Sequence, residues 1–524
     1  MTVTVRLVLA PAEAADPAKY TARAAREARV EQSRVAFSRV VGRSVDARRG
    51  AVKVLLTVEL FLDDAPPPPP VAFDYPYVGA ARPVVIVGSG PAGLFAALRL
   101  IEPGLRPVIL ERGRDVSARK RDIAALNRNA RLDPESNYAF GEGGAGTFSD
   151  GKLFTRSKKR GDCDRALRVL VFHGASEEIL YDAQPHIGTD RLPEVIRSVR
   201  RTILDAGGEI LFGRRADGLA VRGGRVAGVV SGDEVVEGLA VVLAAGHSAD
   251  DIYRMLAREG VALEPKPFAV GVRAEHPQAL IDRIQYRMPE RGEYLPAASY
   301  RLVAQAGGRG VYSFCMCPGG FMVPAMTAAA ESVVNGMSPA ARNSPYANSG
   351  IVVEVGERDY APLLPEYGPL AGLELRARLE REARRQAAGS GGAEGFRAPA
   401  QRLTDFMAGR RSASLPASSY LPGLVSSRLD EWLPPFISGA LRAGFADFGR
   451  KMKGYVTGEA LIAGVESRTS APVRIPRDPA TLEHPGMPGL YPAGEGAGYA
   501  GGIISAALDG ERVAEAVAAA VKNR

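Results

Sequence analysis

Cysteine is scarce in this sequence, because 524 residues contain only Cys163, Cys315 and Cys317. Three thiols cannot form the disulfide framework of a small secreted protein, which indicates a reducing compartment. Two neighbouring thiols are also too few for a closed zinc site, and Cys163 would not complete one without further ligands. We therefore expect neither a disulfide scaffold nor a bound metal.

Long apolar runs are missing as well. No stretch approaches the roughly 20 apolar residues that a membrane-spanning helix needs. The first residues, MTVTVRLVLAPAEA, place Arg6 inside the apolar run and have no basic lead, unlike a signal peptide. These absences predict a cytoplasmic protein without a membrane partner.

Dense charge of one sign is also rare, although the net charge is +8 and the pI is near 9.3. The basic residues are scattered, and RSKKR at 156–160 is the one dense cluster. This pattern suits an anionic small molecule such as a nucleotide or an acidic metabolite, and it disfavours nucleic acid. No sequence signal reports the oligomeric state.

What the chain does contain is the composition of a globular protein of two or three domains, with 46% hydrophobic and 24% charged residues. Five prolines at 66–70 make a stiff spacer between folding units. Before it, VTVRLVL and AVKVLLTVEL read as strands, and Asp16-Pro17 reads as the start of a helix that runs to about Val30. We expect a small ferredoxin-like α+β domain at 1–65 and a Pro-rich linker at 66–81.

After the linker, VVIVGSGPAGLFAALRL reads as a buried strand, a glycine turn and a helix, and PVILE reads as a second strand ending in Glu111. Gly88 permits the tight turn, Gly90 lets the backbone approach a pyrophosphate, and Gly93 lets helix and strand pack closely. Glu111 stands where a carboxylate accepts hydrogen bonds from a ribose. Strand, turn, helix, strand and acid in register predict a Rossmann-like dinucleotide-binding domain.

Two later segments favour FAD as the dinucleotide. Residues 209–246 read as a β-meander of short strands, EILFG, LAV, RVAGVV and VEGLAVVLAAG, of which the last closes on Ala245-Gly246. Near the C-terminus, a strand leads to Gly494-Glu495-Gly496, and a helix begins around Gly501-Gly502-Ile503. The free N–H groups and positive dipole end of that helix can stabilise negative charge on a reduced flavin ring.

The segment GTFSDGKL (146–153) matches the phosphate loop of NTPases in all but its last position. A true loop has Ser or Thr after the lysine, a strand directly before it and a helix directly after it. Here Leu153 takes the hydroxyl position and FGEGGAG precedes the loop, so we exclude an NTPase. The glycines instead predict backbone amides close to a cofactor, with Lys152 or Ser149 as donors to phosphate or ring oxygens.

Longer motifs give a specific resemblance: FGEGGAGTFSDGKL (140–153), KPFAVGVRAEHPQ (266–278), YSFCMCPGG (312–320), VESRTSAPVRI (465–475) and GEGAGYAGGIISAALDG (494–510). Together with RSVDAR, HIGTD, AAGHSADD and NGMS, they resemble the family of predicted FAD-dependent dehydrogenases along the whole chain. The resemblance implies an FAD-binding domain at 82–265 and 461–524, with an inserted α+β substrate domain at 266–460. It implies FAD as cofactor and leaves the reaction open.

The expected cofactor contacts fall into four groups. They are Gly88, Ser89, Gly90, Pro91, Ala92 and Gly93 in the first turn; Glu111 and Arg112 after the second strand; Gly144, Gly146, Thr147, Ser149, Gly151 and Lys152 in the glycine-rich loop; and Ala245, Gly246, Gly494, Glu495, Gly496, Gly502 and Ile503 near the ring.

The candidate catalytic residues are Cys315, Cys317, His247 and Arg468. YSFCMCPGGFMV reads as a hairpin with its turn at 318–320, which would place both cysteines on one face of a strand about 6.6 Å apart between Cα atoms. That separation is near the upper limit for a disulfide, so a bond would require bending. Inert thiols in the wall of the site and a redox or nucleophilic pair are both open interpretations.

The remaining candidates each have a structural alternative. His247 follows the strand that reaches the cofactor and could donate a proton or cap a turn. His276, after Glu275, could belong to an acid/base pair or to a surface ion pair. Arg468 and Thr469 could hold a substrate carboxylate, or Arg468 could form a structural salt bridge.

Missing motifs separate the flavoprotein classes. Disulfide reductases carry CxxxxC soon after the first strand–helix–strand unit and a second glycine motif, and this chain has neither. Aromatic hydroxylases carry an Asp-Gly and a late Gly-Asp, but Asp217-Gly218 falls too early and Glu495 takes the late acid position. We expect an FAD-dependent dehydrogenase or reductase that transfers a hydride between the flavin and a small-molecule substrate. NADH or NADPH is a candidate transient donor.

Two further classes stay open beside a flavoprotein monooxygenase. A tRNA-modifying flavoprotein fits the basic pI, and it would show a lysine- or arginine-lined groove. A non-catalytic FAD-containing interaction protein would act through the N-terminal domain, where RSVDAR (43–48) is the relevant feature.

Overall fold

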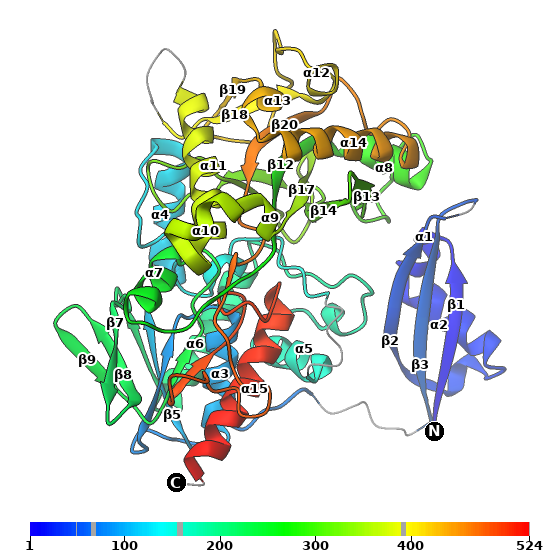
Figure 1. Ribbon diagram of the computed structural model, residues 1–524. Helices are drawn as coiled ribbons and strands as arrows, with labels where there is room; N and C mark the ends of the chain where they lie inside the picture. Colours follow the sequence, from blue (N-terminus) through cyan, green and yellow to red (C-terminus); the bar gives the residue numbers. More distant parts are fainter. Residues whose placement is uncertain (49, 64–69, 155–160, 389–394, 523–524) are drawn as a thin grey trace.

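The structure is a computed structural model that describes residues 1–48, 50–63, 70–154, 161–388 and 395–522. Residues 66–69 of the predicted linker and the RSKKR cluster lie outside these ranges. The described chain forms an N-terminal domain, a nucleotide-binding domain and an inserted domain (Figure 1). None of the described helices is long and apolar enough to cross a membrane.

The N-terminal domain is a three-stranded antiparallel sheet in the order β1-β3-β2 with α2 on one face. Its elements are β1 (Thr2–Leu9), α1 (Pro11–Ala14), α2 (Pro17–Glu27), the 3₁₀ helix η1 (Gln32–Arg34), β2 (Val35–Asp46) and β3 (Lys53–Leu62). Asp16 caps α2 as predicted, because its carboxylate accepts hydrogen bonds from the N–H groups of Ala18 and Lys19.

The predicted ferredoxin-like fold is wrong in detail. That fold repeats strand–helix–strand twice and has four strands, whereas the described residues of this domain form three strands and one long helix. The chain after Leu62 is rich in proline, which has no N–H to donate to a fourth strand.

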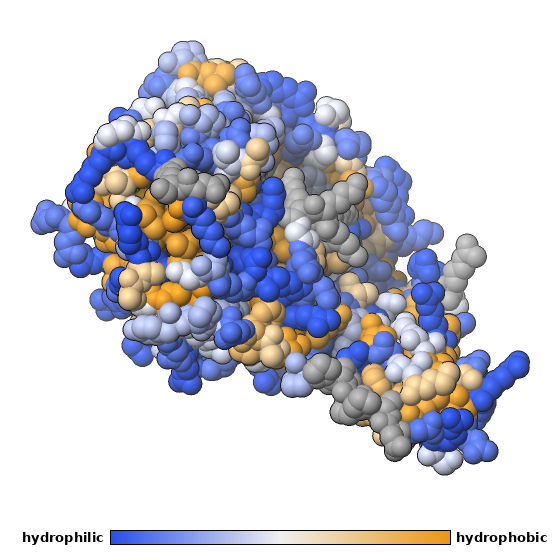
Figure 2. All heavy atoms as spheres, turned by 90° about the horizontal axis from the view of Figure 1, so that it is seen from below, coloured by the Kyte–Doolittle hydropathy of each residue, from blue (hydrophilic) through white to orange (hydrophobic). Residues whose placement is uncertain are grey.

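The N-terminal domain projects from the rest of the molecule as a separate lobe (Figures 1 and 2). It meets the nucleotide-binding domain along β2. The N–H of Arg43 donates to the carbonyl of Tyr181 over 2.9 Å, and the N–H of Ala183 donates to the carbonyl of Arg43 over 2.9 Å. The Arg43 guanidinium also lies 2.8 Å from Asp182. Arg43, the first residue of RSVDAR, therefore lies in the contact between the two domains.

The nucleotide-binding domain has a parallel five-stranded sheet in the order β22-β10-β4-β5-β6. These strands are β4 (Pro83–Val87), β5 (Arg106–Glu111), β6 (Glu209–Phe212), β10 (Val241–Leu243) and β22 (Leu490–Pro492). The strand order reverses between β4 and β10, and ligands of such sheets bind beyond the carboxyl ends at that point. The sheet confirms the predicted Rossmann-like fold.

Both faces of this sheet are covered, as the continuous apolar sequence of β4 requires. On one face, Val84 and Ile86 pack with α3 (Pro91–Ile101), α5 (Cys163–Phe172), α6 (Leu192–Asp205) and α15 (Ile503–Lys522). On the other face, Val85 and Val87 pack with α7 (Asp250–Arg258) and with an antiparallel sheet of β7 (Gly218–Arg222), β8 (Arg225–Ser231) and β9 (Glu234–Glu237).

The predicted β-meander is shorter than the sequence indicated. EILF forms β6 of the parallel sheet, and VEGLAVVLAAG divides into β9 and β10. The remaining elements of this domain are α4 (Val116–Asn129), η2 (Gly144–Gly146), η3 (Glu177–Leu180), β11 (Glu264–Pro265) and β21 (Val473–Arg474). The last two pair with each other where the chain leaves and re-enters the domain.

The inserted domain is built on a seven-stranded mixed sheet in the order β13-β14-β17-β12-β20-β18-β19. Its strands are β12 (Phe268–Pro277), β13 (Val303–Ala306), β14 (Arg309–Cys317), β17 (Tyr346–Val355), β18 (Ala398–Arg402), β19 (Leu424–Ser426) and β20 (Leu461–Glu466). The sequence predicted that the insertion ends at residue 460, but β20 lies inside this sheet. The chain therefore returns to the nucleotide-binding domain after Glu466.

Helices cover this sheet and line its contact with the nucleotide-binding domain (Figure 1). They are α8 (Gln278–Tyr286), α9 (Glu357–Tyr360), η4 (Ala361–Leu363), α10 (Leu364–Tyr367), η5 (Gly368–Leu370), α11 (Ala371–Ala388), α12 (Leu403–Ala408), α13 (Leu429–Trp432) and α14 (Pro435–Lys451). A separate two-stranded sheet joins β15 (Phe321–Pro324) to β16 (Val334–Met337).

The predicted hairpin around residues 318–320 is wrong, because β14 pairs with β13 and β17 while β15 pairs with β16. The N–H of Gly320 donates to Tyr346 of β17, which turns the chain away from β14. Gly319 has φ +49, and a Cβ there would lie 1.8 Å from the carbonyl oxygen of Arg342. Only glycine fits this close crossing.

Candidate functional site

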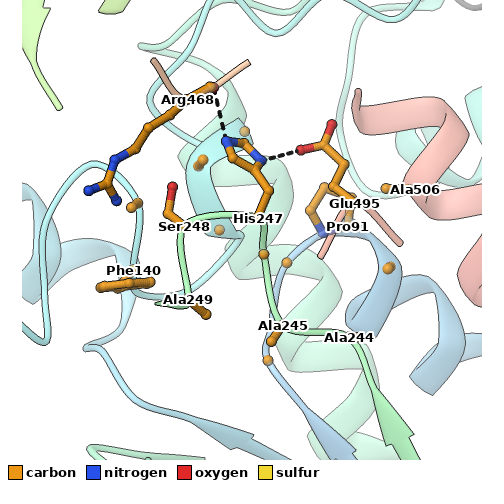
Figure 3. Close-up of a pocket in the computed structure, with 18 of the residues that line it drawn as sticks. Pro91, Phe140, Ala244, Ala245, His247, Ser248, Ala249, Arg468, Glu495 and Ala506 are labelled. Carbon is orange, nitrogen blue, oxygen red and sulfur yellow. Dashed lines mark hydrogen bonds and ion pairs between the residues drawn. The ribbon is translucent and has the colours of Figure 1, made fainter. Parts of the chain in front are cut away.

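A cavity of about 490 Å³ opens at the carboxyl ends of β4 and β10 and runs to the inserted domain. Three glycine-containing segments form one end: 88–92 after β4, 141–146, and 501–503 before α15. Phe314, Cys315 and Asn335 form the other end. Figure 3 shows His247 in the cavity wall, with Pro91 and Glu495 on one side and Arg468 on the other.

The turn after β4 has the geometry expected of a nucleotide-binding turn. Gly88 has φ +98, and a Cβ on it would lie 2.8 Å from the carbonyl oxygen of Ala244. A Cβ on Gly93 would lie 1.9 Å from the carbonyl oxygen of Gly88, so α3 packs directly on the turn. Gly90 precedes α3 and faces Gly144. The reasons given for Gly88 and Gly93 from sequence are confirmed by these contacts.

Glu111 joins two of the glycine segments. One carboxylate oxygen accepts from the N–H and hydroxyl of Ser89 over 2.9 and 2.7 Å. The other accepts from the N–H groups of Gly113 and Gly141 over 2.8 and 3.0 Å. A carboxylate has about four lone-pair sites, and protein donors already use four. Glu111 therefore shapes both loops at the cavity wall, and the ribose contact stays a prediction.

Arg119 shapes the glycine-rich loop from behind. Its side chain is fully buried and donates to the carbonyl oxygens of Asn137, Tyr138, Gly141, Glu142 and Gly144. Burial lowers the pKa of Arg119 to about 10, which leaves it charged at neutral pH. Sequence reasoning missed this residue, because one arginine among scattered basic residues gives no signal.

Glu142 lies in the same loop and is fully buried. One carboxylate oxygen accepts from the N–H of Val116 over 2.8 Å and from Arg200 over 3.0 Å. The other has no hydrogen-bond partner among the described residues. Burial raises the pKa of Glu142 to about 7 despite Arg200.

His247 links the carboxyl end of β10 to the C-terminal segment. Its Nδ1 lies 2.8 Å from Oε2 of Glu495, and its Nε2 lies 3.0 Å from the carbonyl oxygen of Arg468 (Figure 3). The backbones of the two segments touch, because a Cβ on Gly496 would lie 1.8 Å from the carbonyl oxygen of Ala245. Although burial raises the pKa of Glu495, the hydrogen bond from His247 holds it below its usual value.

Arg468 forms a buried ion cluster rather than a free anion site. Nη2 lies 3.0 Å from Glu380 and 2.9 Å from Glu331, and 3% of the side chain is exposed. Its Nη1 has no hydrogen-bond partner among the described residues. The structural salt bridge that the sequence left open is thus present, and one donor remains in a residue of the cavity wall.

The two cysteines lie at the other end of the cavity. Cys315 lines it, whereas Cys317 lies behind with no exposed surface. The β14–β17 ladder changes register between Phe314 and Cys317, and Cys315 has φ +46. A hydrogen bond from Cys317 lowers the pKa of Cys315 to about 5, with the charges of Lys152 and Arg273 offsetting the opposite effect of burial.

Lys152 lies beside these thiols. Its ammonium donates to the carbonyl oxygen of Met316 and lies 3.6 Å from Oδ2 of Asp150. Asp150 is itself buried and paired with Arg342 over 2.6 Å. Burial lowers the pKa of Lys152, but the negative charge of the neighbouring thiol pair and of Asp150 more than offsets that effect and raises it. The lysine of GTFSDGKL thus stabilises negative charge at the end of β14.

A second cation, Arg273, is fully buried and supports β14. Arg273 and Glu466 form a bidentate ion pair over 2.8 and 3.0 Å, and neither side chain is exposed. Arg273 also donates to Asn348 over 2.7 Å and to Asn335 over 3.1 Å. Sequence reasoning missed this pair. An arginine inside the apolar strand FAVGVRAEHP was the available signal.

Most predicted cofactor residues line the cavity, and a few lie just behind it. The lining includes Gly88, Gly90, Pro91, Ala92, Glu111, Arg112, Gly144, Gly146, Ser149, Gly151, Lys152, Ala245, Gly246, Glu495, Gly502 and Ile503. Outside the lining are Ser89, Gly93, Thr147, Gly494 and Gly496. Thr147, for example, donates to the carbonyl oxygen of Glu142 and holds the loop.

The possible pair of Glu275 and His276 does not form. Successive residues of β12 point to opposite faces of the sheet. Glu275 accepts from Ser419, whereas His276 contacts the carbonyl oxygen of Tyr455 over 2.8 Å and lies outside the cavity lining. Burial lowers the pKa of His276 to about 4. It is a neutral core residue.

The cavity has the features that FAD requires. A Cβ on Gly246, Gly501 or Gly502 would meet no protein atom within 4 Å, so bare backbone borders the space there. The first residues of α3 and α15 also line the cavity, which brings two positive helix ends to it. This cradle suits a long, anionic dinucleotide.

Comparison with known proteins agrees with this geometry. Residues 81–127 match the family model of an FAD binding domain, and residues 267–469 match that of an FAD-dependent protein, C-terminal domain-like. Residues 1–61 match a domain of unknown function. The two FAD-related matches cover the first glycine turn and the inserted sheet.

A protein of Clostridium beijerinckii described as uncharacterised is 45% identical over 439 residues, covering 83% of this chain and 80% of that protein. A probable electron transfer flavoprotein-quinone oxidoreductase of Escherichia coli is 28% identical over 222 residues, 41% of this chain and 48% of the relative. A flavin-dependent brominase structure aligns over 85% of this chain and 80% of its own, with 14% identity and a TM-score of 0.38. The chain belongs to the FAD-dependent oxidoreductase family, together with the Clostridium beijerinckii protein.

Proposed function

We propose that this protein is an FAD-dependent dehydrogenase or reductase that transfers a hydride between the flavin and a small-molecule substrate. The observation that carries the proposal is the continuity of the cavity. One space joins the dinucleotide cradle at Gly88 and Gly90 to a wall made by Cys315 and Asn335 of the inserted domain. A substrate at that wall would lie next to the cofactor in the same enclosed space.

Residues of three segments would hold FAD. The turn at 88–92 and the loop at 141–146 offer glycine backbone and a helix end to the pyrophosphate. The start of α15 offers a second helix end to the ring. The bound flavin would supply hydride transfer, and the protein supplies orientation, charge and exclusion of water.

His247 and Glu495 would hold a proton in this cavity. Both atoms that face the imidazole, the carboxylate oxygen and the carbonyl oxygen of Arg468, accept hydrogen bonds. Both contacts are hydrogen bonds at the same time when each ring nitrogen carries a proton. That arrangement places a transferable proton on the cavity wall, which suits a reaction that moves a hydride and a proton together.

The test is an anaerobic absorbance spectrum of the flavin-loaded protein before and after addition of NADH or NADPH. Rapid bleaching would support a reductase with a nicotinamide donor, and enones and quinones would then be assayed as acceptors. Quinones are included because the Escherichia coli relative is described as a probable quinone oxidoreductase.

Bleaching by a panel of small alcohols, amines and acids, but by neither nicotinamide, would support a dehydrogenase reduced by its own substrate. Protein that binds no flavin, or flavin that no donor reduces although dithionite does, would contradict the proposal. The second result would favour a non-catalytic role.

A further inference from the structure

Strand β14 ends in a bulge that carries two thiols. Its ladder with β17 pairs Phe314 with Gly350 and Cys317 with Asn348, so three residue steps on β14 oppose two on β17. Cys315 has φ +46, a conformation that residues with a Cβ seldom adopt. A regular strand would place the two cysteines near the upper limit of disulfide geometry. The bulge bends the strand at these two residues.

The Cys317 thiol is turned toward Cys315. Its S–H donates to the carbonyl oxygen of Cys315, with Sγ 3.3 Å from that oxygen, and the interaction with the Cys317 side chain lowers the pKa of Cys315. The same interaction and burial raise the pKa of Cys317 well above its usual value. One thiol is thus held ionised and the other protonated.

The two cysteines also differ in exposure. Cys315 faces the cavity, and Cys317 is completely buried behind it. Thiol–disulfide exchange requires one accessible thiolate and a second thiol within reach that closes the bond. Position and ionisation therefore assign the attacking role to Cys315 and the resolving role to Cys317.

Two cations, the partly exposed Lys152 and the fully buried Arg273, hold this arrangement. The Lys152 ammonium donates to the carbonyl oxygen of Met316, between the two cysteines. Nη1 of Arg273 lies 3.4 Å from the carbonyl oxygen of Cys315. Asp150 pairs with Lys152, and Glu466 pairs with Arg273, so each cation is partly neutralised. Both cations approach the bulge itself, which is unexpected for thiols that only fill space.

We propose that Cys315 and Cys317 are a redox-active dithiol that exchanges two electrons with the flavin in the shared cavity. Oxidation forms one Sγ–Sγ bond, releases the Cys317 proton and any proton on Cys315, and gives two electrons to the flavin, which takes up the corresponding protons. The reverse step consumes reduced flavin and restores both thiols. The inference rests on the proposed function for the identity of the electron carrier alone.

The first experiment follows the thiols without any assay of activity. A Cys163→Ser background leaves these two cysteines as the only thiols in the chain. The flavin-loaded protein is equilibrated anaerobically in mixtures of reduced and oxidised dithiothreitol, alkylated and weighed by mass spectrometry. We expect both thiols to disappear in one two-electron transition, with the unalkylated chain lighter by two hydrogen atoms. Independent alkylation of each thiol at every ratio would overturn the proposal.

Variants of Cys317 separate disulfide formation from thiol ionisation. Cys317→Ser keeps a hydroxyl donor, so Cys315 should react with iodoacetamide at pH 7 at nearly the wild-type rate, although no disulfide can form. Cys317→Ala removes the donor, and the rate should fall by about tenfold for each unit by which the pKa of Cys315 rises above 7. Equal rates in both variants would contradict the assigned hydrogen bond.

Lys152 gives a further check on the local field. Lys152→Met should slow alkylation of Cys315, and Lys152→Arg should restore it. Because the mass measurement needs only the Cys163→Ser background, misfolding of a Cys317 or Lys152 variant does not leave the dithiol untested.

The second experiment tests exchange with the flavin. Protein whose pair is oxidised is photoreduced anaerobically, and the flavin spectrum and the number of alkylatable thiols are then followed in darkness. We expect the oxidised flavin spectrum to return as two thiols appear, and we expect no return in Cys317→Ser. A disulfide that survives beside reduced flavin would overturn the exchange. If no substrate and no nicotinamide reduces the flavin, the proposed function is contradicted. The photoreduction measurement would still test the dithiol, because light supplies the electrons.

Discussion

Nδ1 of His247 lies 2.8 Å from Oε2 of Glu495, although 248 residues separate them in the sequence. On the far side of the ring, Nε2 meets a carbonyl oxygen at 3.0 Å. Both contacts can be hydrogen bonds at the same time when each ring nitrogen carries a proton. This relationship links the end of β10 to the segment before α15, and it makes the two segments one unit of the cavity wall.

Replacing His247 tests that unit. His247→Leu removes both hydrogen bonds and leaves the Glu495 carboxylate without its donor, so we expect a loss of about 1–3 kcal/mol in the free energy of unfolding at pH 7. Since His247 lowers the pKa of Glu495, this contribution is present above the usual carboxyl pKa and should shrink as the pH falls below it. Urea denaturation across this range measures both effects.

The controls are Glu495→Gln and the double variant that combines it with His247→Leu. The glutamine amide can donate to a neutral ring, so its cost should be smaller than that of His247→Leu. The two substitutions should be non-additive by at least about 0.5 kcal/mol. Additive costs would show that the 2.8 Å contact carries no coupling energy.

Gly90 is the most direct test of cofactor binding. Gly90→Val places a branched side chain in the cradle beside Gly144, so we expect the purified protein to contain no flavin by absorbance. Gly439→Ala is the matched control, because a Cβ at this exposed position of α14 meets no atom within 4 Å. It should retain stoichiometric flavin and gain about 0.5–1 kcal/mol of stability. Stoichiometric flavin in Gly90→Val would refute the assignment of the turn.

His276 should make the protein less stable in mild acid. Its ring is buried and its pKa is lowered to about 4, so the unfolded chain binds more protons between that value and the usual pKa near 6.5. Stability from this residue is complete above about pH 6.5 and falls by up to about 3 kcal/mol as the pH drops to 4. His276→Gln keeps a donor for Tyr455 and cannot titrate. Its stability, measured by urea denaturation, should fall less over this range.

Glu142 should change the stability of the protein with pH in the opposite direction to His276. Its pKa is raised to about 7, so the folded protein binds more protons than the unfolded chain between the usual carboxyl pKa and that value. The protein should therefore lose stability as the pH rises through this window. Glu142→Gln keeps an acceptor for Val116 and removes the titration, so its advantage over the wild type should grow from pH 5 to pH 7 and then level off. An advantage independent of pH would contradict the shifted pKa.

Charge reversal at the domain contact should loosen the N-terminal domain. Arg43→Glu places a carboxylate beside Asp182 and Glu178, so the amide of Ala183, which bonds the Arg43 carbonyl, should exchange its hydrogen faster. Arg23→Glu is the control, because its exposed partner Glu27 lies on the same helix. Mass-spectrometric hydrogen exchange compares the two. Equal rates at Ala183 would show that the backbone bonds alone hold the contact.

Local patterns predicted the nucleotide-binding domain well, because its determinants are close in sequence. Gly88, Gly93 and Glu111 belong to one strand–turn–helix–strand unit, and residue type alone restricts what each can do. The inserted domain was harder. Its sheet pairs β12 with β20 across almost two hundred residues, and nothing near residue 460 marks Leu461 as a strand of that sheet.

The same distinction applies to the site. Cys315, His247 and Arg468 were found because reactive residue types lay next to recognisable segments. Arg119 was not, since its five carbonyl partners come from a loop about 20 residues away that only the folded structure brings around it. The bulge at Cys315 was also invisible, because YSFCMC has no glycine to mark a break in the strand.

The position of β22 in the sheet has a consequence for synthesis. β10 pairs with β4 on one side and with β22 on the other, and β22 is made roughly 250 residues later. At about 5–20 residues per second, the ribosome leaves one edge of β10 unpaired for roughly 12 to 50 seconds. The apolar side of α3 that α15 covers stays exposed for longer, because about 400 residues separate these two helices. Nascent chains of this protein are therefore exposed to edge-to-edge aggregation until the final strand and helix emerge, which makes this interval the natural point for chaperone protection.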